Sequence, residues 1–82
     1  MKIRIEEREY EGTDAEIMEQ LRRELEPERI PDADSYTQYL CANFTRTTGL
    51  PCVLPETGVE ERARTMLRRL AYAGALLLLD EN

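Results

Sequence analysis

The chain has 82 residues, of which 41% are apolar and 34% charged, and this length fits one folded domain and excludes a second. Its formal net charge of -6, from 17 acidic and 11 basic residues, argues against a surface built throughout to bind phosphate backbones. Two cysteines without any histidine cannot complete a tetrahedral zinc site within the chain, so we expect no metal and no other cofactor.

The start of the chain predicts a β-hairpin. Isoleucines at positions 3 and 5 alternate with basic residues, which is the period of a half-buried strand. A turn at residues 6–7 pairs Ile3 with Tyr10 and Arg4 with Glu9, so apolar side chains meet on one face and opposite charges on the other. Glu-Glu suits a primed two-residue turn poorly, because such turns need positive φ, and this leaves open a looser loop or a bulge that shifts the register.

Three helices are expected to follow the hairpin. Each begins with a hydroxyl residue and has Glu or Gln three positions later, which is the pattern of a capping box. The three pairs are Thr13 with Glu16, Ser35 with Gln38, and Thr57 with Glu60. The expected helices end at about Leu25, extend from about Tyr36 to Thr48, and extend from about Val59 to Ala73, with Pro27, Gly49 and Gly74 as stop signals.

Two further apolar segments complete the fold prediction. Residues 52–54 lie between prolines and form at most a short edge strand. Residues 75–79 follow a glycine and are predicted to form a buried strand beside the N-terminal strand; pairing within the chain and pairing with another chain both remain open. The predicted fold class is α+β, with a small, mainly antiparallel sheet of hairpin and C-terminal strand packed against three α-helices, and with residues 1–82 as a single domain.

The first seven residues and the longest apolar run carry no targeting or membrane signal. The first seven residues are charged at alternate positions, unlike a secretory signal, and the longest apolar run, residues 75–79, is far below the roughly 20 residues that cross a bilayer. We therefore expect a cytoplasmic protein without a membrane partner, in which Cys41 and Cys52 are reduced thiols.

Several segments together resemble a known group of proteins. They are Tyr10-Glu11-Gly12-Thr13, residues 15–22, Glu61-Arg62-Ala63, and residues 67–71 before Gly74. The chain is similar over most of its length to small bacterial proteins of prophage or mobile-element type. The resemblance implies a shared fold and carries no known activity.

The constellations that enzymes use are missing from the sequence. Serine or cysteine nucleophiles need an adjacent base, and histidine, the commonest base, does not occur. Ser35 is the only serine, and its expected role as a helix cap accounts for its presence without a catalytic role. The four glycines are isolated, so they form no phosphate-binding loop. We therefore expect that the protein is not an enzyme.

Charge is distributed unevenly along the chain. Residues 1–34 hold 12 acidic and 6 basic residues, a balance of -6, whereas residues 35–82 hold 5 of each. The expected third helix has a basic outer face. Because Glu60 lies one turn before Arg64, the favourable order for an intrahelical pair, Arg62, Arg68 and Arg69 are left to meet a partner beside an exposed Tyr72. The alternative is a solvated face without a partner.

The second expected helix suggests a small pocket. On the helical wheel Asn43 falls between Tyr39 and Leu40, so its amide approaches an apolar arc that also includes Tyr36. Buried amides need hydrogen-bond partners, and the nearest backbone is the connection over residues 49–55. Tyr36, Tyr39 and Asn43 are therefore the candidate residues of a small-ligand pocket.

The run of four leucines at residues 76–79 and a short sheet leave apolar faces and strand edges that a chain of this size covers poorly. We expect a small, non-enzymatic protein-interaction module, either an adaptor or a homodimer that pairs through the hairpin or the C-terminal strand. Leu77 and Leu79 are the candidate contacts on the sheet, and Arg62, Arg68, Arg69 and Tyr72 those on the third helix. The alternative is a nucleic-acid-binding accessory protein that uses the same arginines, although the connection of roughly nine residues before the third helix is too long for a helix-turn-helix.

Overall fold

The N-terminal hairpin forms with the register that the sequence predicts. In the computed structural model, which describes residues 1–79, strand β1 (Lys2–Ile5) pairs antiparallel with β2 (Arg8–Glu11), and Ile3 lies opposite Tyr10. Glu6 adopts a φ of 56°, so the two-residue turn closes and the pairing is not shifted. On the outer face of the hairpin, Lys2 Nζ lies 3.2 Å from a Glu9 carboxylate oxygen.

A third strand completes the sheet. Strand β3 (Leu77–Leu78) pairs antiparallel with β1, and the strand order is β2-β1-β3. The C-terminal segment therefore pairs within its own chain, although the strand is shorter than the expected residues 75–79. Ile3 is thus flanked by Tyr10 and Leu78, which places its side chain at the centre of the inner face.

The first helix, α1 (Asp14–Leu25), begins with the predicted capping box. The Thr13 hydroxyl accepts the Glu16 backbone N–H at 3.1 Å, and the Glu16 carboxylate accepts the Thr13 backbone N–H at 2.8 Å. These two bonds satisfy donors that have no partner inside the helix, so the sequence pattern locates the helix start correctly.

The capping box predicted for the second helix is wrong. Helix α2 (Ala33–Thr48) begins three residues before the expected Tyr36. Asp32 is the actual N-cap, and its carboxylate accepts the Ser35 backbone N–H at 2.7 Å. Asp is at least as good an N-cap as Ser, so the earlier candidate prevails. Gly49, with a φ of 74°, ends the helix as predicted.

The capping box predicted for the third helix is also wrong. Helix α3 (Val59–Tyr72) begins after Gly58, which supplies no side-chain cap. The Thr57 hydroxyl binds Glu61 instead of Glu60. At the other end the helix stops as expected, because Gly74, with a φ of 83°, turns the chain back towards the sheet.

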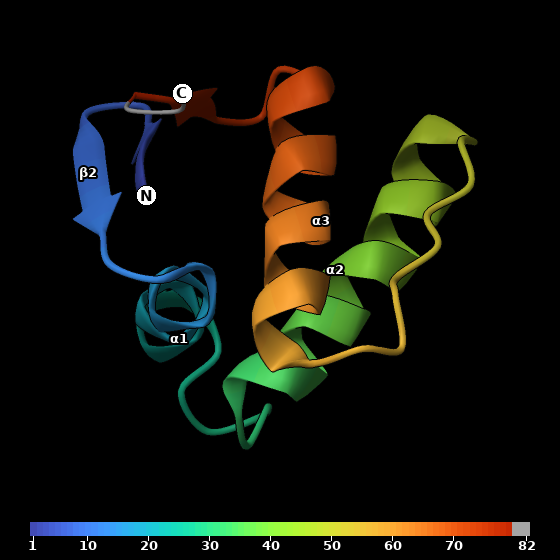
Figure 1. Cartoon of the computed structure of the whole chain (residues 1–82), viewed down its shortest axis with the longest axis horizontal. Helices are drawn as coiled ribbons and strands as arrows, with labels where there is room; N and C mark the ends of the chain where they lie inside the picture. Colours follow the sequence, from blue (N-terminus) through green and yellow to red (C-terminus); the bar gives the residue numbers. More distant parts are fainter. Residues whose placement is uncertain (80–82) are drawn as a thin grey trace.

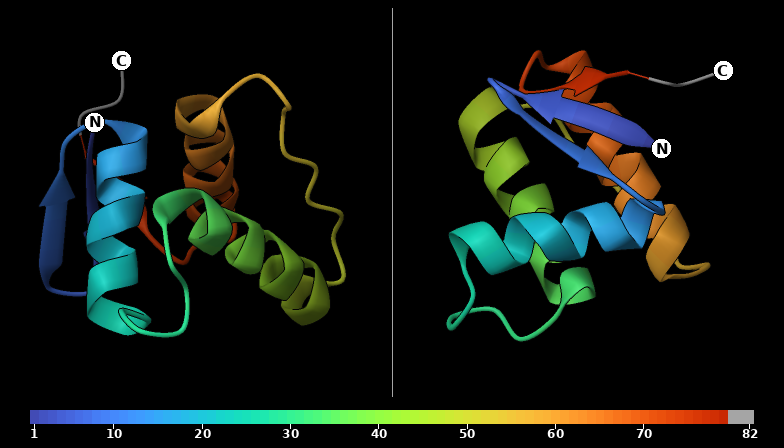
Figure 2. Two further views of the ribbon diagram at one scale, coloured as in Figure 1. Left: turned by 90° about the horizontal axis from the view of Figure 1, so that it is seen from below. Right: turned by 90° about the vertical axis from the view of Figure 1, so that its left-hand side faces the viewer.

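The three helices lie on one side of the sheet (Figures 1 and 2) and share one core. Every pair of helices is in contact, and α1 also packs against β2. The core consists of the following buried apolar residues: Ile3, Ile17, Met18, Leu21, Ile30, Tyr36, Phe44, Ala63, Met66, Leu67 and Leu76. The α+β fold class is therefore confirmed.

The connection between α2 and α3 is not a strand. Residues 52–54 are irregular, which corrects the prediction of a short edge strand. Figure 1 shows this connection running beside α2 and α3 on the side away from the sheet, so no strand lies near enough to pair with it. The flanking prolines, Pro51 and Pro55, also lack the N–H that a ladder requires.

Candidate functional site

The expected interaction face on α3 is smaller than the sequence indicates, because Arg62 is engaged inside the molecule. Arg62 Nε donates to Asp34 Oδ1 at 2.7 Å, and only 22% of the Arg62 side chain is exposed. This hydrogen bond lowers the pKa of Asp34. The prediction that Arg62 is left for a partner is therefore wrong, since the first turn of α2 supplies its counter-ion.

The predicted pair between Glu60 and Arg64 is wrong as well. The Glu60 carboxylate accepts the Thr13 hydroxyl at 2.9 Å and the Ala15 backbone N–H at 2.8 Å, both at the start of α1. Arg64 Nε instead donates to Asp14 Oδ2 at 3.1 Å. Unpaired N–H groups and the positive end of the helix dipole attract carboxylates to this position, and the helical wheel of α3 alone cannot reveal that another helix starts beside it.

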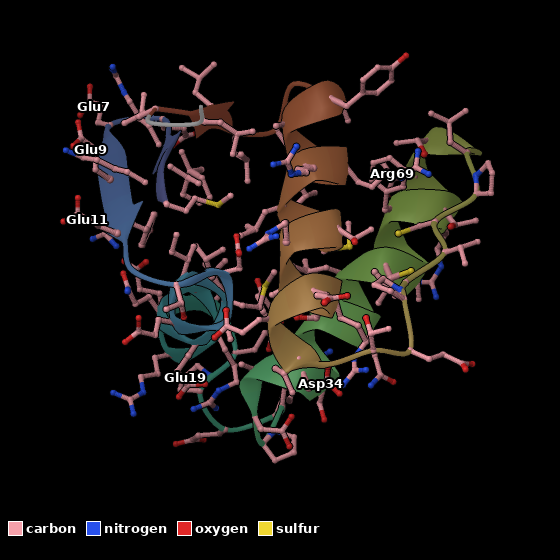
Figure 3. The ribbon with its side chains drawn as sticks, in the orientation of Figure 1. Glu7, Glu9, Glu11, Glu19, Asp34 and Arg69 are labelled. Carbon is pink, nitrogen blue, oxygen red and sulfur yellow. The ribbon has the colours of Figure 1, made fainter. Side chains whose placement is uncertain are left out.

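The rest of the predicted α3 face is at the surface. Arg68 and Arg69 are exposed, and Tyr72, the last residue of the helix, is 83% exposed. Arg68 already has an interaction within the chain. In Figure 3 the Arg69 side chain extends from α3 towards the C-terminal end of α2. Arg69 and Tyr72 are therefore the members of this face that remain most accessible.

The two leucines predicted on the sheet are exposed beside its edge. Leu77 is 59% exposed and Leu79 is 41% exposed, whereas Leu78 between them is half-buried opposite Ile3. Side chains alternate along a strand, so Leu77 and Leu79 both point to the outer face. Figure 1 shows β3 and the last turn of α3 at the same end of the molecule, which brings these leucines and Tyr72 to one end.

The backbone of Leu78 faces the edge of the sheet. The Leu79 N–H donates to the Lys2 carbonyl at 2.9 Å, so Leu79 directs its backbone groups towards β1. Because these directions alternate in an antiparallel ladder, the N–H and C=O of Leu78 point away from β1. Among residues 1–79 no strand pairs with that side of β3.

The three residues predicted to line a small pocket do not come together around one. Tyr36 is buried and stacks on Tyr39, with ring centroids 6.1 Å apart, and the Arg29 guanidinium lies 5.8 Å from the centroid of the Tyr39 ring. Burial raises the pKa of Tyr36. Asn43 lines a different cavity, and within residues 1–79 its amide has no hydrogen bond to the 49–55 connection. The two tyrosines therefore belong to the packing of α2.

The cavity beside Asn43 is an open pocket of about 290 Å³ between the C-terminal halves of α2 and α3. We call it the α2–α3 pocket. Leu40, Phe44 and Leu70 provide its apolar wall, and Asn43, Ala73 and Ala75 are at its rim together with two threonines. The spacing of apolar residues in α2 predicts one wall of this pocket from sequence. The residues that α3 adds cannot be predicted in this way, because they depend on how the two helices cross.

A larger open groove of about 860 Å³ lies between the hairpin turn and the end of α1. Arg8 and the Tyr10 hydroxyl both bind Glu24 across it. Glu24 is therefore already engaged, and Leu25, which is 63% exposed, is the main apolar residue at the surface of the groove.

The two cysteines are free thiols that lie side by side. The Cys41 thiol donates to the Cys52 carbonyl at 3.0 Å, and the Cys52 sulfur lies 3.8 Å from the Met66 sulfur. Burial, together with the hydrogen bond to Cys41, raises the pKa of Cys52 to about 12. A thiol in this state is a poor nucleophile. Within the described residues there is also no cluster of His, Cys, Asp or Glu that could hold a metal ion.

Comparisons with protein-family models, curated proteins and solved structures find no match to this chain. The resemblance to prophage or mobile-element proteins therefore stays a prediction. Within residues 1–79 no helix has the length and apolar character that crossing a membrane requires.

Proposed function

We propose that the protein is a small, non-enzymatic interaction module of the cytoplasm that self-associates through strand β3. The observation that carries this proposal is the exposure of Leu77 and Leu79 beside an edge of the sheet with which no strand in residues 1–79 pairs. Exposed apolar side chains at an open strand edge favour pairing with a second strand.

A two-fold axis through Leu78 gives the simplest geometry. The outward N–H and C=O of Leu78 would bond the same groups of a second copy, and the two sheets would join into one of six strands. In this register Leu77 lies opposite Leu79 of the other copy, so two apolar cross-strand pairs form on the outer face. Burying a leucine fully contributes about 1.5–3 kcal/mol, which makes these pairs the main source of affinity.

The other edge of the sheet is a poorer candidate. Strand β2 carries Arg8, Glu9 and Glu11 at exposed positions. Charged side chains of this kind discourage edge-to-edge pairing, and two copies would bring like charges together. We therefore assign self-association to β3 and not to the hairpin.

Nucleic-acid binding is the less favoured function. Of the four arginines of α3, Arg62 and Arg64 form ion pairs with Asp34 and Asp14 of the same chain. The remaining basic groups would compete against a net charge of -6, so contact with phosphates would be weak and sensitive to salt.

The first experiment is light scattering across micromolar concentrations at low and high salt. We expect a dimer that survives high salt, because its contacts are apolar. Leu77→Glu should give a monomer, since it places like charges at the two-fold interface. The matched control is Leu25→Glu, another exposed leucine, on the helix that packs against β2; this variant should remain a dimer.

Two outcomes would overturn the proposal. The first is a wild-type protein that stays monomeric at every concentration. The second is equal loss of the dimer in both variants, because this would show that added negative charge, and not the β3 surface, is responsible.

A further inference from the structure

The residues that line the α2–α3 pocket come from two long stretches of sequence without acidic residues. No acidic residue occurs between positions 35 and 55 or between positions 62 and 79. The helices that form the pocket therefore bring no carboxylate to its rim from their C-terminal halves. The first 34 residues, by contrast, carry the whole net charge of -6.

Two arginines are close to this pocket by helical spacing, although neither is among the residues that line it. Arg46 is three residues after Asn43 on α2, and Arg69 is four residues before Ala73, so each lies one helical turn from a rim residue. Both are in the last turn of their helix, where about half a negative charge is expected from the helix dipole. Two full positive charges exceed these two half charges, so the local charge balance of the two helix ends is positive.

The volume and lining of the pocket suit one apolar side chain. Binding sites for small molecules usually measure about 300–1,000 Å³, and this pocket, at about 290 Å³, is at the lower limit. Its apolar wall offers nothing to a charged group, whereas the Asn43 amide at the rim has both a donor and an acceptor, as a peptide backbone requires.

We propose that the α2–α3 pocket binds an acidic peptide segment of a partner protein, with one large apolar side chain in the pocket and carboxylates on Arg46 and Arg69. This surface is separate from β3, so the inference does not depend on the dimer. Charge complementarity selects this occupant: a second copy of the chain would bring its own arginines to the same rim.

The test uses fluorescence anisotropy with the full chain and a short labelled peptide that has one phenylalanine among glutamates. Binding should weaken at least tenfold when alanine replaces the phenylalanine, and also when lysines replace the glutamates. Ala73→Phe should fill the pocket and weaken binding to a similar degree. Arg69→Glu should do the same, whereas Arg23→Glu on α1, a matched charge reversal, should have little effect.

Ala73 is exposed, so Ala73→Phe is expected to fold, and circular dichroism checks this.

The proposal is overturned if the phenylalanine peptide does not bind, or if it binds no better than its alanine version. It is also overturned if a single-stranded oligonucleotide binds in place of the peptide and Arg69→Glu abolishes that binding. A dimer lost in Ala73→Phe would assign the pocket to a second copy. Peptide binding that persists in Leu77→Glu separates this site from the β3 interface.

Discussion

Glu60 joins the beginnings of two helices. It lies in the first turn of α3, yet its carboxylate binds the Thr13 hydroxyl and the Ala15 N–H at the start of α1. Asp14 and Arg64 form an ion pair beside it. The second oxygen of Asp14, Oδ1, is buried and has no hydrogen-bond partner, so this junction already contains one unsatisfied acceptor. The two hydrogen bonds that Glu60 accepts are therefore expected to contribute to the stability of this junction.

We expect Glu60→Ala to lower the free energy of unfolding by about 1 kcal/mol, because two donors at the start of α1 lose their acceptor. Urea denaturation measures this change. Glu61→Ala is the control, since Glu61 binds Thr57 in the adjoining loop and reaches no other helix; its effect should stay within about 0.5 kcal/mol. Equal losses in the two variants would contradict the role of Glu60 as a link between helices.

At the scale of elements, Gly74 forms the corner between α3 and the sheet. The Gly74 N–H donates to the Ala71 carbonyl at 3.0 Å and the Ala75 N–H donates to the Leu70 carbonyl at 2.8 Å. These two bonds are those of a Schellman motif, which requires a left-handed residue at the position of Gly74. The same turn brings Ala75 beside Leu70 at the α2–α3 pocket and directs the chain to β3.

Gly74→Ala should therefore destabilise the protein by about 1–2 kcal/mol, the cost of a left-handed conformation for a residue with a Cβ. Thermal and urea denaturation both report this loss. Gly58→Ser is the matched control, because Gly58 is extended, has no heavy atom within 4 Å of an added Cβ, and would gain a capping hydroxyl. It should be at least as stable as the wild type, and a loss equal to that of Gly74→Ala would contradict this explanation.

The strands and helix ends were mostly predicted from local pattern, although two of the three capping boxes were wrong, and the side-chain contacts between neighbouring helices were not predicted. The pairing of Ile3 with Tyr10 follows from alternation over ten residues, and the stop at Gly74 follows from one residue type. The role of Glu60 and the ion pair of Arg62 depend on which helix starts beside α3, which no helical wheel contains. The α2–α3 pocket was missed for the same reason, because two helices separated in sequence form it.

At the scale of the whole molecule, ion pairs connect the acidic first part of the chain to the basic helix. Asp14 and Asp34 bind arginines of α3, so these pairs hold α1 and α2 against it. Glu19 acts within the first part: it binds Arg22, which also donates to the Ile30 carbonyl at 2.7 Å and thereby fixes the connection after α1. The excess of acidic groups is thus partly used in the fold.

These pairs predict how stability depends on pH. The hydrogen bond from Arg22, with a further one from Arg23, lowers the pKa of Glu19 to about 2, and the hydrogen bond from Arg62 lowers that of Asp34. A carboxyl whose pKa is lower in the folded state stabilises the protein above its unfolded pKa, and this contribution disappears as the pH falls through the folded pKa. We therefore expect the contribution of Glu19 to be complete above about pH 5 and to be lost towards pH 2, and that of Asp34 to be lost as the pH falls through its own lowered pKa.

The measurement is urea denaturation over this pH range for the wild type and for the double variant Glu19→Gln with Asp34→Asn. Protonation of the many unpaired acidic groups also relieves repulsion in a chain with a net charge of -6, and this effect has the opposite sign. Because it is nearly the same in both proteins, the difference between their stabilities isolates the two ion pairs. The wild type should be more stable at pH 7, and the two curves should converge as the pH approaches 2. A difference that stays constant over the whole range would show that the substitutions act through packing and not through charge.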